Sequence, residues 1–348
     1  MSKISVVILN WNGSEMLFRF LPSVLHWSTM PDVEICVADN GSTDQSVQML
    51  HEYFPSVRVI ILGENFGFAG GYNRALKQIE SDYVVLLNSD VEVTENWLEP
   101  VVDYLDAHPE IAVCQPKILN YSQKDSFEYA GAAGGFIDRY GYPFCRGRVM
   151  GITEKDKGQY NTIIPVFWAS GAAFFIRLKD YRAVEGLDEI FFAHMEEIDI
   201  CWRLRARGRE IVCIPQSKVY HVGANTLKKE DPHKTFLNFR NNLLMLYKNL
   251  PEKEFERVMY TRIILDYLAA FSFLCKGQFP NAIAVIRARR EYRTICPFLL
   301  SIRKENLKET LHSYIPERID KSILVWFYIK GRKFFSQLPF DFLPFSHN

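Results

Sequence analysis

The sequence predicts an α/β fold, in which a mostly parallel central sheet is flanked by helices and followed by a helical C-terminal extension. Three observations lead to this class. Short apolar runs alternate with helix-like segments through the first hundred residues, these runs are continuous as in strands buried on both faces, and the last third of the chain looks helical. A chain of 348 residues has room for one large core with an extension.

The first hundred residues supply the parallel part of the sheet. We expect strands at 4–9, 33–39, 57–62 and 82–87, with helices between them at 14–27, 43–54 and 69–79. This order implies right-handed crossovers and helices on both faces of the sheet. Ligands of such sheets bind beyond the carboxyl ends of the strands, so a site is expected there.

Beyond residue 110 the pattern is less regular. A strand-like segment at 166–177, a helix at 196–208 and a short strand at 210–215 precede a long helical region. We therefore expect a unit at 1–235, with halves at 1–110 and 111–235, and a helical extension at 236–348.

Composition excludes several classes of protein. The chain is 48% hydrophobic and 24% charged, which are globular values, and 41 basic against 41 acidic residues give no field for nucleic acid. Seven cysteines without a C-x-x-C pair indicate reduced thiols in the cytosol. The N-terminus lacks a signal-peptide layout and the longest uncharged stretch, 158–176, is interrupted by polar residues, so we predict no transmembrane helix.

The expected strand ends are all polar. Asp39 follows the second strand, where a carboxylate can accept the imide N–H of a uracil or thymine ring, although an Asx turn capping the next helix explains it too. Asp90 follows the fourth strand, where it can bind a hard cation such as Mg²⁺ together with a substrate diphosphate. For either residue alone an ordinary turn is the simpler interpretation.

The segment ENFGFAGGYNRALKQ, 64–78, is rich in glycine and opens a helix, so its backbone N–H groups can meet phosphate. It lacks the G-x-G-x-x-G spacing, which weakens the rival interpretation as an NAD-dependent dehydrogenase. Arg74 can reach a nucleotide from this helix, or it can be a solvated helix arginine.

Two further groups are candidates for chemistry. His221 follows a short strand and can complete a metal site with Asp90, which would favour Mn²⁺, or it is a core histidine. Glu196, Glu197 and Asp199 lie together after an aromatic run, where crowding raises a carboxyl pKa toward that of a general base. The simpler interpretation is that they complement the helix dipole.

Together these motifs resemble the family 2 glycosyltransferases, inverting enzymes of the GT-A fold, and most closely their rhamnosyltransferase-like branch. The resemblance runs from Ile4 to Asn225, and it depends on the order and spacing of the segments VVILNWNG, VADNGSTD, ENFGFAGGYNRA, LLNSD, WASGAAFFIR, GLDEIFFAHMEEIDICWR and YHVGAN.

The resemblance implies a role for each matching residue. The nucleotide-sugar would contact Asn10, Asp39, Asn65, Gly70, Arg74, Asn88, Ser89 and Asp90, and Mg²⁺ or Mn²⁺ would bind Asp90 and His221. The catalytic base would be Glu197 or Glu196, and the acceptor would contact Trp168, Ser170, Gly171, Asp199 and Trp202. NSD departs from the family's D-x-D motif at Asn88, which the resemblance makes a ribose or sugar contact.

The implied function is transfer of a sugar from a nucleoside-diphosphate donor to a glycan hydroxyl during surface polysaccharide synthesis. Rhamnose from a deoxythymidine-diphosphate donor follows from the branch, a uridine-diphosphate hexose is the alternative donor, and a nucleotide-sugar-binding protein without catalysis is the alternative class. A polyprenyl-diphosphate acceptor would place the protein in the cytoplasm or on the inner face of the plasma membrane. The basic, aromatic extension suits such a membrane surface, or it is a helical bundle that packs on the core.

Overall fold

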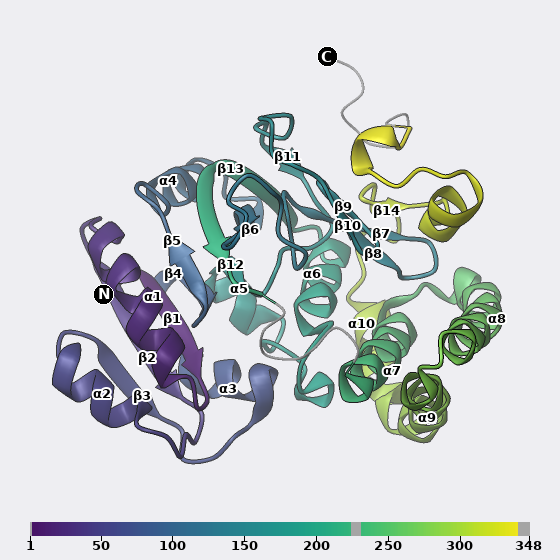
Figure 1. Cartoon of the computed structure of the whole chain (residues 1–348), viewed down its shortest axis with the longest axis horizontal. Helices are drawn as coiled ribbons and strands as arrows, with labels where there is room; N and C mark the ends of the chain where they lie inside the picture. Colours follow the sequence, from purple (N-terminus) through teal and green to yellow (C-terminus); the bar gives the residue numbers. More distant parts are fainter. Residues whose placement is uncertain (1, 224–230, 340–348) are drawn as a thin grey trace.

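A computed structural model describes residues 2–223 and 231–339 of the chain. One large sheet lies beside a smaller sheet, and the C-terminal helices gather below the smaller one (Figure 1). The first half alternates strand and helix as predicted, with β1 Ser2–Asn10, α1 Ser14–Trp27, β2 Val33–Asp39, α2 Ser46–Tyr53, β3 Arg58–Ile61, α3 Gly67–Leu76 and β4 Ser81–Asn88.

The large sheet has the strand order β11-β13-β6-β12-β4-β1-β2-β3, with β5 paired to β13. Strands β1 to β4 are parallel to one another, whereas β12, β11 and β5 run antiparallel to the strands they pair with. Its later elements are β5 Val91–Val93, α4 Glu99–Ala107, β6 Ile111–Asn120, β11 Ile164–Pro165, β12 Ala173–Arg177, α5 Leu178–Ala183, α6 Glu196–Ala206 and β13 Glu210–His221. The predicted fold class is confirmed, with a mixed rather than purely parallel sheet.

The core lies on both faces of this sheet. Along β4, Val84 and Leu86 pack into one apolar cluster, whereas Val85 and Leu87 pack into the other. All four side chains are buried, which is why this strand is an uninterrupted apolar run. Because the apolar run ends where the core ends, the polar residues that follow it lie at the edge of the sheet.

The strand at 166–177 and the strand at 210–215 were predicted with the wrong lengths. Only Ala173–Arg177 forms β12, while Trp168 makes an isolated bridge to Gly135 of the small sheet. Strand β13 continues to His221, with a register shift between Ile214 and Lys218 against β6. The irregularity obscures the alternation from which a strand is recognised.

The small sheet has the order β10-β9-β8-β7-β14. Four of its strands come from the middle of the chain, and the fifth comes from near the C-terminal end; they are β7 Gly135–Asp138, β8 Pro143–Cys145, β9 Arg148–Val149, β10 Ile152–Thr153 and β14 Arg318–Ile319. Because β14 pairs with β7, the extension returns to the first part of the chain.

The extension consists mainly of the helices α7 Pro232–Asn249, α8 Glu252–Cys275, α9 Phe279–Ile295 and α10 Leu300–Lys308. Helix α7 lies between α6 and α9, and α8 packs against α9 (Figure 1). A short helical turn at Cys296–Leu299 comes just before α10, and two more lie after it at Val325–Ile329 and Phe335–Gln337. The last nine residues of the expected extension, 340–348, lie outside the described part.

The prediction of no transmembrane helix stays a prediction, because α8 is long and apolar enough to cross a membrane by length and composition. A search for uncharged stretches missed it because Arg262 and Asp266 interrupt the apolar sequence. Only 28% of the most apolar stretch of this helix is buried inside the protein.

Candidate active site

The nucleoside end of the candidate site is built by strands β1 and β2. Asn10 lies directly opposite Asp39 in the parallel register, and its amide Nδ2 is 3.3 Å from Asp39 Oδ1. Asp39 Oδ2 also accepts a hydrogen bond from the Ser42 backbone at 3.1 Å, so the expected Asx turn is present as well. Both side chains are buried, and Asn10 Oδ1 has no hydrogen-bond partner, which leaves an acceptor available to a ligand.

Hydrogen bonds join the loop that follows β1 to the loop that follows β2. Asn12 Oδ1 accepts hydrogen bonds from the backbones of Thr43 and Asp44, at 2.7 and 3.2 Å, while Ser42 Oγ accepts one from the Asn12 backbone at 2.9 Å. Asn12 itself has a φ of 51°, a conformation that asparagine tolerates better than most residues. The sequence prediction missed Asn12, although its position in NWNG after a buried strand was the available signal.

Side chains hold the glycine-rich segment in place. Asn65 Oδ1 accepts hydrogen bonds from the Gly67 backbone at 2.8 Å and from Asn40 Nδ2 at 3.1 Å. Gly67 has a φ of +70°, and a Cβ there would lie 2.5 Å from the Phe192 ring, so no other residue fits. The backbone of Phe68 donates to Phe192 O at 2.8 Å, which joins this segment to the one before α6.

Arg74 and Gly70 lie outside the cavity that Asp90, Glu197 and His221 line. The Arg74 guanidinium makes an ion pair with Glu189 at 2.8 Å and lies over the Phe66 ring at 3.7 Å. Gly70 packs against Phe66 inside α3. The contact of Arg74 with the nucleotide therefore stays a prediction, and in this structure its guanidinium has a partly exposed carboxylate partner.

The candidate metal ligands meet because β13 pairs with β5. His221 is opposite Val91 in the register, and the Val222 backbone donates to Asp90 O at 3.1 Å. This brings His221 Nε2 to 3.1 Å from Asp90 Oδ1 and to 3.5 Å from the Asn88 amide nitrogen. On the other side of the ring, Nδ1 lies 3.4 Å from Glu128 Oε2.

The two carboxylates control the charge of the histidine. Burial alone would lower the pKa of His221, but hydrogen bonds and charge from Asp90 and Glu128 raise it to about 10. Burial likewise tends to raise the Asp90 pKa, whereas the hydrogen bond and charge of His221 bring it below its ordinary value. Glu128 was not predicted, because nothing near it in the sequence marks it as the partner of a histidine far along the chain.

The acid pair opens helix α6. The three residues Phe192, His194 and Met195, just before the helix, have positive φ values of 60°, 71° and 76°, and strain of this kind is often found at functional sites. Burial raises the pKa of Glu197 to about 7, against weaker lowering by backbone N–H groups. Burial and the charge of Glu197 raise the Glu196 pKa well above its ordinary value. Each side chain has a buried Oε2 without a hydrogen-bond partner.

One cavity of about 500 Å³ brings much of the predicted site together. Its lining includes seven predicted residues, which are Asn88, Asp90, Ser170, Gly171, Glu196, Glu197 and His221. Asn10, Asp39, Asn65 and Ser89 lie outside the lining. The sequence prediction missed Glu128, His194 and three residues of α7, namely Lys234, Thr235 and Asn238.

A second cavity of about 430 Å³ adjoins the first. Trp168 lines it with other aromatic and apolar side chains, among them Tyr142, Met150 and Phe239. Among the described residues, Glu197 is the carboxylate that lines both cavities. His194 also lines both, and burial with the charges of Lys234 and His233 lowers its pKa to about 4.

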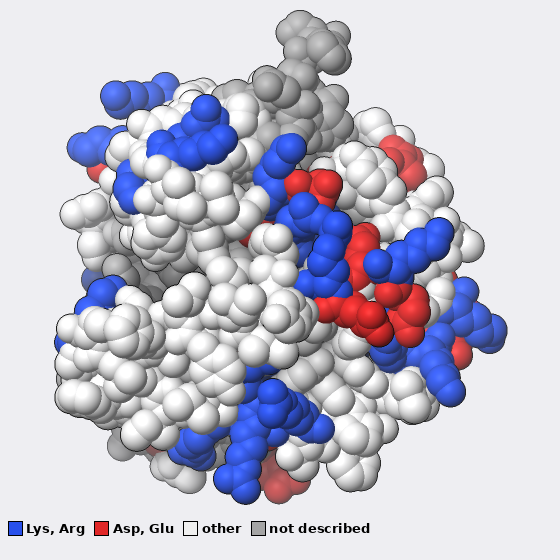
Figure 2. Space-filling view, turned by 90° about the vertical axis from the view of Figure 1, so that its right-hand side faces the viewer, with Lys and Arg blue, Asp and Glu red and all other residues white. Residues whose placement is uncertain are grey.

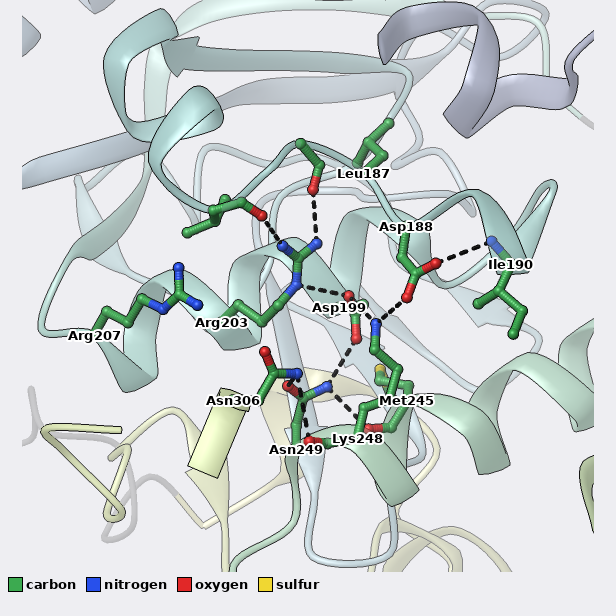
Figure 3. Close-up of polar contacts among 12 residues, drawn as sticks. Leu187, Asp188, Ile190, Asp199, Arg203, Arg207, Met245, Lys248, Asn249 and Asn306 are labelled. Carbon is green, nitrogen blue, oxygen red and sulfur yellow. Dashed lines mark hydrogen bonds and ion pairs between the residues drawn. The ribbon is translucent and has the colours of Figure 1, made fainter. Parts of the chain in front are cut away.

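Asp199 and Trp202 lie in the interior, which corrects the expectation that they contact an acceptor. Asp199 accepts hydrogen bonds from Arg203 Nε and Lys248 Nζ, both at 2.9 Å, and from Asn249 Nδ2 at 2.8 Å (Figure 3). Trp202 packs edge-on against Phe167, with ring centroids 5.4 Å apart. Two residues along a helix correspond to about 200° of rotation, so Asp199 faces away from Glu197.

A third cavity, of about 880 Å³, lies beside this network and contains none of the predicted site residues. Two of its cations are already paired: Lys248 pairs with Asp188 at 2.6 Å, and Arg203 donates to the Gly186 carbonyl at 2.8 Å as well as to Asp199 (Figure 3). Its third cation, Arg207, donates to the Ala183 carbonyl. Because buried charges already paired in this way have little left for a ligand, the site is assigned to the two smaller cavities.

Comparison with known proteins defines the class. Residues 5–178 match the family described as Glycosyl transferase family 2. The match spans half of the chain, so the protein belongs to this family. Several solved glycosyltransferases share its fold, which is the GT-A fold predicted from the sequence. The C-terminal end of the resembling region, Ala224 and Asn225 of YHVGAN, lies outside the described residues.

Individual relatives are moderately similar. The chain is 27% identical over 245 residues to an N-acetylglucosaminyl-diphospho-decaprenol L-rhamnosyltransferase of Mycobacterium tuberculosis, covering 65% of this chain and 78% of the relative. It is 23% identical over 266 residues to the low-salt glycan biosynthesis hexosyltransferase Agl10 of Haloferax volcanii, covering 75% and 80%. The particular relatives therefore place the chain in the rhamnosyltransferase-like branch.

Solved structures agree on the fold. S. aureus TarS 1-349 superposes with a TM-score of 0.52 at 16% identity, covering 88% of both chains. A Pyrobaculum calidifontis mannosyltransferase, solved with GDP-Man and Mn²⁺, gives 0.51 at 12% identity over 88% and 84% of the chains. GalNAc-T7, solved with UDP, GalNAc and Mn²⁺, superposes with a TM-score of 0.57 at 17% identity. The match covers 71% of this chain and 48% of GalNAc-T7, so this chain spans about half the length of that protein.

Proposed function

We propose that this glycosyltransferase inverts the anomeric carbon of its donor, with Glu197 as the general base. The observation that carries this assignment is that Glu197 lines both cavities, between the Asp90 and His221 end and the aromatic end. A base must reach the acceptor hydroxyl while that hydroxyl faces the donor sugar. Glu196 lines only the donor-side cavity, which makes it the weaker candidate of the pair.

The charges of the site suit this reaction. An acceptor hydroxyl attacks the anomeric carbon from the face opposite the diphosphate, the bond from that carbon to the diphosphate oxygen breaks, and Glu197 takes the hydroxyl proton. With a pKa raised to about 7, Glu197 is a stronger base than an ordinary carboxylate and is still ionised in a large fraction of molecules at neutral pH. Burial and the charge of Glu197 raise the pKa of Glu196 well above its ordinary value, which makes it the harder of the two carboxyls to ionise.

A divalent cation fits between Asp90 and His221. The described residues contain no cluster of three or more His, Cys, Asp or Glu that could hold a metal by themselves. The facing oxygen and nitrogen of Asp90 and His221 would suit Mg²⁺ or Mn²⁺ once Nε2 has released its proton, because an imidazole binds a metal through an unprotonated nitrogen. Glu128 beside Nδ1 orients the ring so that Nε2 faces Asp90. When bound, the cation would neutralise negative charge that grows on the diphosphate.

The nucleoside would lie across the ends of β1 and β2. Asp39 Oδ1 and the unpartnered Asn10 Oδ1 are acceptors suited to the N–H groups of a base or to ribose hydroxyls. A uracil or thymine ring presents an imide N–H to such acceptors. Asn88 lies between this end and Asp90, where an amide can bind a ribose or sugar hydroxyl without adding charge.

The names of the relatives suggest the substrates. A rhamnosyltransferase acting on an N-acetylglucosaminyl-diphospho-decaprenol supports a deoxythymidine-diphosphate rhamnose donor and a polyprenyl-diphosphate-linked acceptor. A uridine-diphosphate hexose is the alternative donor, since TarS was solved with UDP-GlcNAc. Trp168 and Tyr142 offer apolar faces to a sugar ring in the second cavity, beside Ser170 and Gly171 of the first.

The test is transfer of sugar by the purified full chain. A panel of nucleotide sugars is first screened for thermal stabilisation with Mg²⁺ or Mn²⁺, and each stabilising donor is then incubated with lipid-linked or soluble saccharide acceptors. Formation of a product with inverted anomeric configuration is expected. Donor binding without transfer or hydrolysis would instead indicate the nucleotide-sugar-binding alternative, which the replacement of Asp by Asn88 favours. A product that keeps the donor's configuration would refute the proposed mechanism.

A further inference from the structure

One face of α8 is apolar along most of its length. Its large exposed side chains recur with helical spacing, which places them along one side of the helix; they are Tyr260, Ile264, Tyr267, Leu268, Phe271 and Leu274. Tyr260 is 69% and Phe271 63% exposed, so these residues project from the protein. The apolar face continues onto α9, where Phe279, Ile283 and Ile286 are also exposed. An exposed set of this size marks an interaction surface.

Along the apolar stretch of α8, from Val258 to Cys275, the charged residues are turned away from this face, whereas Glu252, Lys253, Glu256 and Arg257 in its first turns are exposed. Between Val258 and Cys275 the charged residues are Arg262 and Asp266, and both are buried. Arg262 Nη2 donates to Asp266 Oδ1 at 2.9 Å and its Nη1 to the Tyr140 carbonyl at 2.8 Å, while Arg289 of α9 pairs with Asp266 Oδ2. The charged pair holds the helix to the body, and the outward face is left without charge.

Basic side chains border the apolar face. Lys276 lies at the turn between the two helices, and the exposed charged residues of α9 are Arg287, Arg290 and Arg293. The single acid of α9, Glu291, pairs with Arg240 at 2.8 Å. Figure 2 views this side of the molecule and shows a broad area without Lys, Arg, Asp or Glu in its lower half, with basic side chains along the lower border.

We propose that this face of α8 and α9, which we call the docking face, binds the interfacial region of an anionic lipid bilayer. Tyrosine and phenylalanine suit the depth of the headgroups, and each Lys or Arg near an anionic surface adds about 1 kcal/mol. The charge complementarity favours a bilayer over a second copy of this chain, because two docking faces would bring arginines against arginines. The inference deepens the proposed function by bringing the site to a lipid-linked acceptor.

The helix lies on the bilayer and does not cross it. Crossing would require Arg262 and Asp266 to leave Tyr140 and Arg289 for hydrocarbon, and an uncompensated charge there is expensive. An interfacial helix instead buries one apolar face and keeps its polar contacts. Helix α9 packs on α7, whose Lys234 and Asn238 line both cavities, so docking would fix the position of the cavities relative to the lipid surface.

A natural reporter lies at the end of α8. Of the seven cysteines, all within the described residues, Cys275 is the exposed one, and Cys296 is half-buried. The full chain with Cys296→Ser is labelled at Cys275 with an environment-sensitive fluorophore and mixed with vesicles of phosphatidylcholine alone or with phosphatidylglycerol. A blue shift and quenching by lipid-borne quenchers are expected with the anionic vesicles, and a weaker response with the neutral ones.

Two variants separate the contributions. Leu268→Ser with Phe271→Ser is expected to lower the partition coefficient on anionic vesicles by at least about tenfold. Arg287→Gln with Arg290→Gln is expected to lower it by about tenfold or more on anionic vesicles and little on neutral ones. The matched control, Tyr53→Ser with Ile61→Ser, removes comparably exposed apolar residues from α2 and β3 and should bind as the parent does.

Several outcomes would overturn the inference. One is that the label fails to respond to anionic vesicles, and another is that the Leu268→Ser/Phe271→Ser variant binds them as the parent does. Quenching of the Cys275 label by a quencher sealed inside the vesicles would show that the helix spans the bilayer. A parent dimer that this variant dissociates would assign the face to a second copy. Transfer to a soluble acceptor is measured separately and should be unchanged in both variants, so failure of docking and failure of the proposed chemistry give different results.

Discussion

Glu197→Gln is expected to remove catalysis and, above neutral pH, to stabilise the fold. The substitution keeps the shape of the side chain but removes its ability to take a proton, and general-base catalysis is worth about 10² to 10⁴ in rate. Donor binding should remain, because Glu197 lies on the acceptor side of the candidate metal ligands.

The stability effect follows from the buried carboxyl. Its pKa rises from 4.5 in the unfolded chain to about 7 in the folded one, which corresponds to about 3 kcal/mol. Below about pH 4.5 both states are protonated and Glu and Gln should be equivalent. Between these pKa values the folded state binds more protons than the unfolded state, so stability falls as pH rises, and above about pH 7 the whole cost is present. A glutamine, which does not ionise, avoids this cost.

The assay is thermal unfolding of parent and variant at about pH 4.5 and about pH 8. At the higher pH the variant should melt about 4 °C above the parent, from about 2.1 cal/mol/K of unfolding entropy per residue. Glu196→Gln should keep the transfer rate within a few fold, because Glu196 does not line the second cavity, where the acceptor is proposed to bind. Glu95→Gln is an exposed control. Equal melting temperatures at both pH values would refute the raised pKa. Full transfer by Glu197→Gln, or its loss in Glu196→Gln, would refute the choice of base.

Three further predictions concern the rest of the site. Asp90→Ala should lose metal-dependent donor binding, measured by calorimetry with a nucleoside diphosphate and Mn²⁺; unchanged metal dependence would exclude Asp90 as a ligand. Lys248→Met should lower the free energy of unfolding by about 3 to 5 kcal/mol, because Asp188 and Asp199 lose their shared cation, and denaturant titration would show it. Gly67→Ala should destabilise the fold by about 1 to 3 kcal/mol and weaken donor binding, since φ is +70° and Phe192 occupies the space; a normal melt and normal donor titration would contradict it.

The parallel half of the fold was predictable because its signals are local. Strands β1, β2 and β4 each end at a polar residue after apolar positions, and each strand from β1 to β4 is separated from the next by a helix. The meeting of Asp90 with His221 could be proposed from strand ends and the resemblance, but it depends on the pairing of β13 with β5. That pairing joins distant segments through backbone hydrogen bonds, which side-chain patterns do not specify.

Other features could not be predicted for identifiable physical reasons. Glu128 becomes part of the site only through folding of the segment before β7. The prediction for Asp199 was wrong because three neighbouring carboxylates were treated as one cluster, although the helix turns Asp199 to the opposite side. The contribution of α7 was missed because its sequence shows an amphipathic helix and gives no sign of which surface it will cover.

The salt bridge between Asp199 and Lys248 has a consequence for engineering this protein. Helix α6 carries the proposed base, Glu197, and the ion pair of Asp199 with Lys248 joins this helix to α7, the first helix of the extension. Chimaeras that graft the N-terminal half onto a foreign tail would remove Lys248 and Asn249 and leave Asp199 with the cation of its own helix, Arg203. Exchanges of substrate preference among relatives should therefore transplant the base-bearing helix and α7 together.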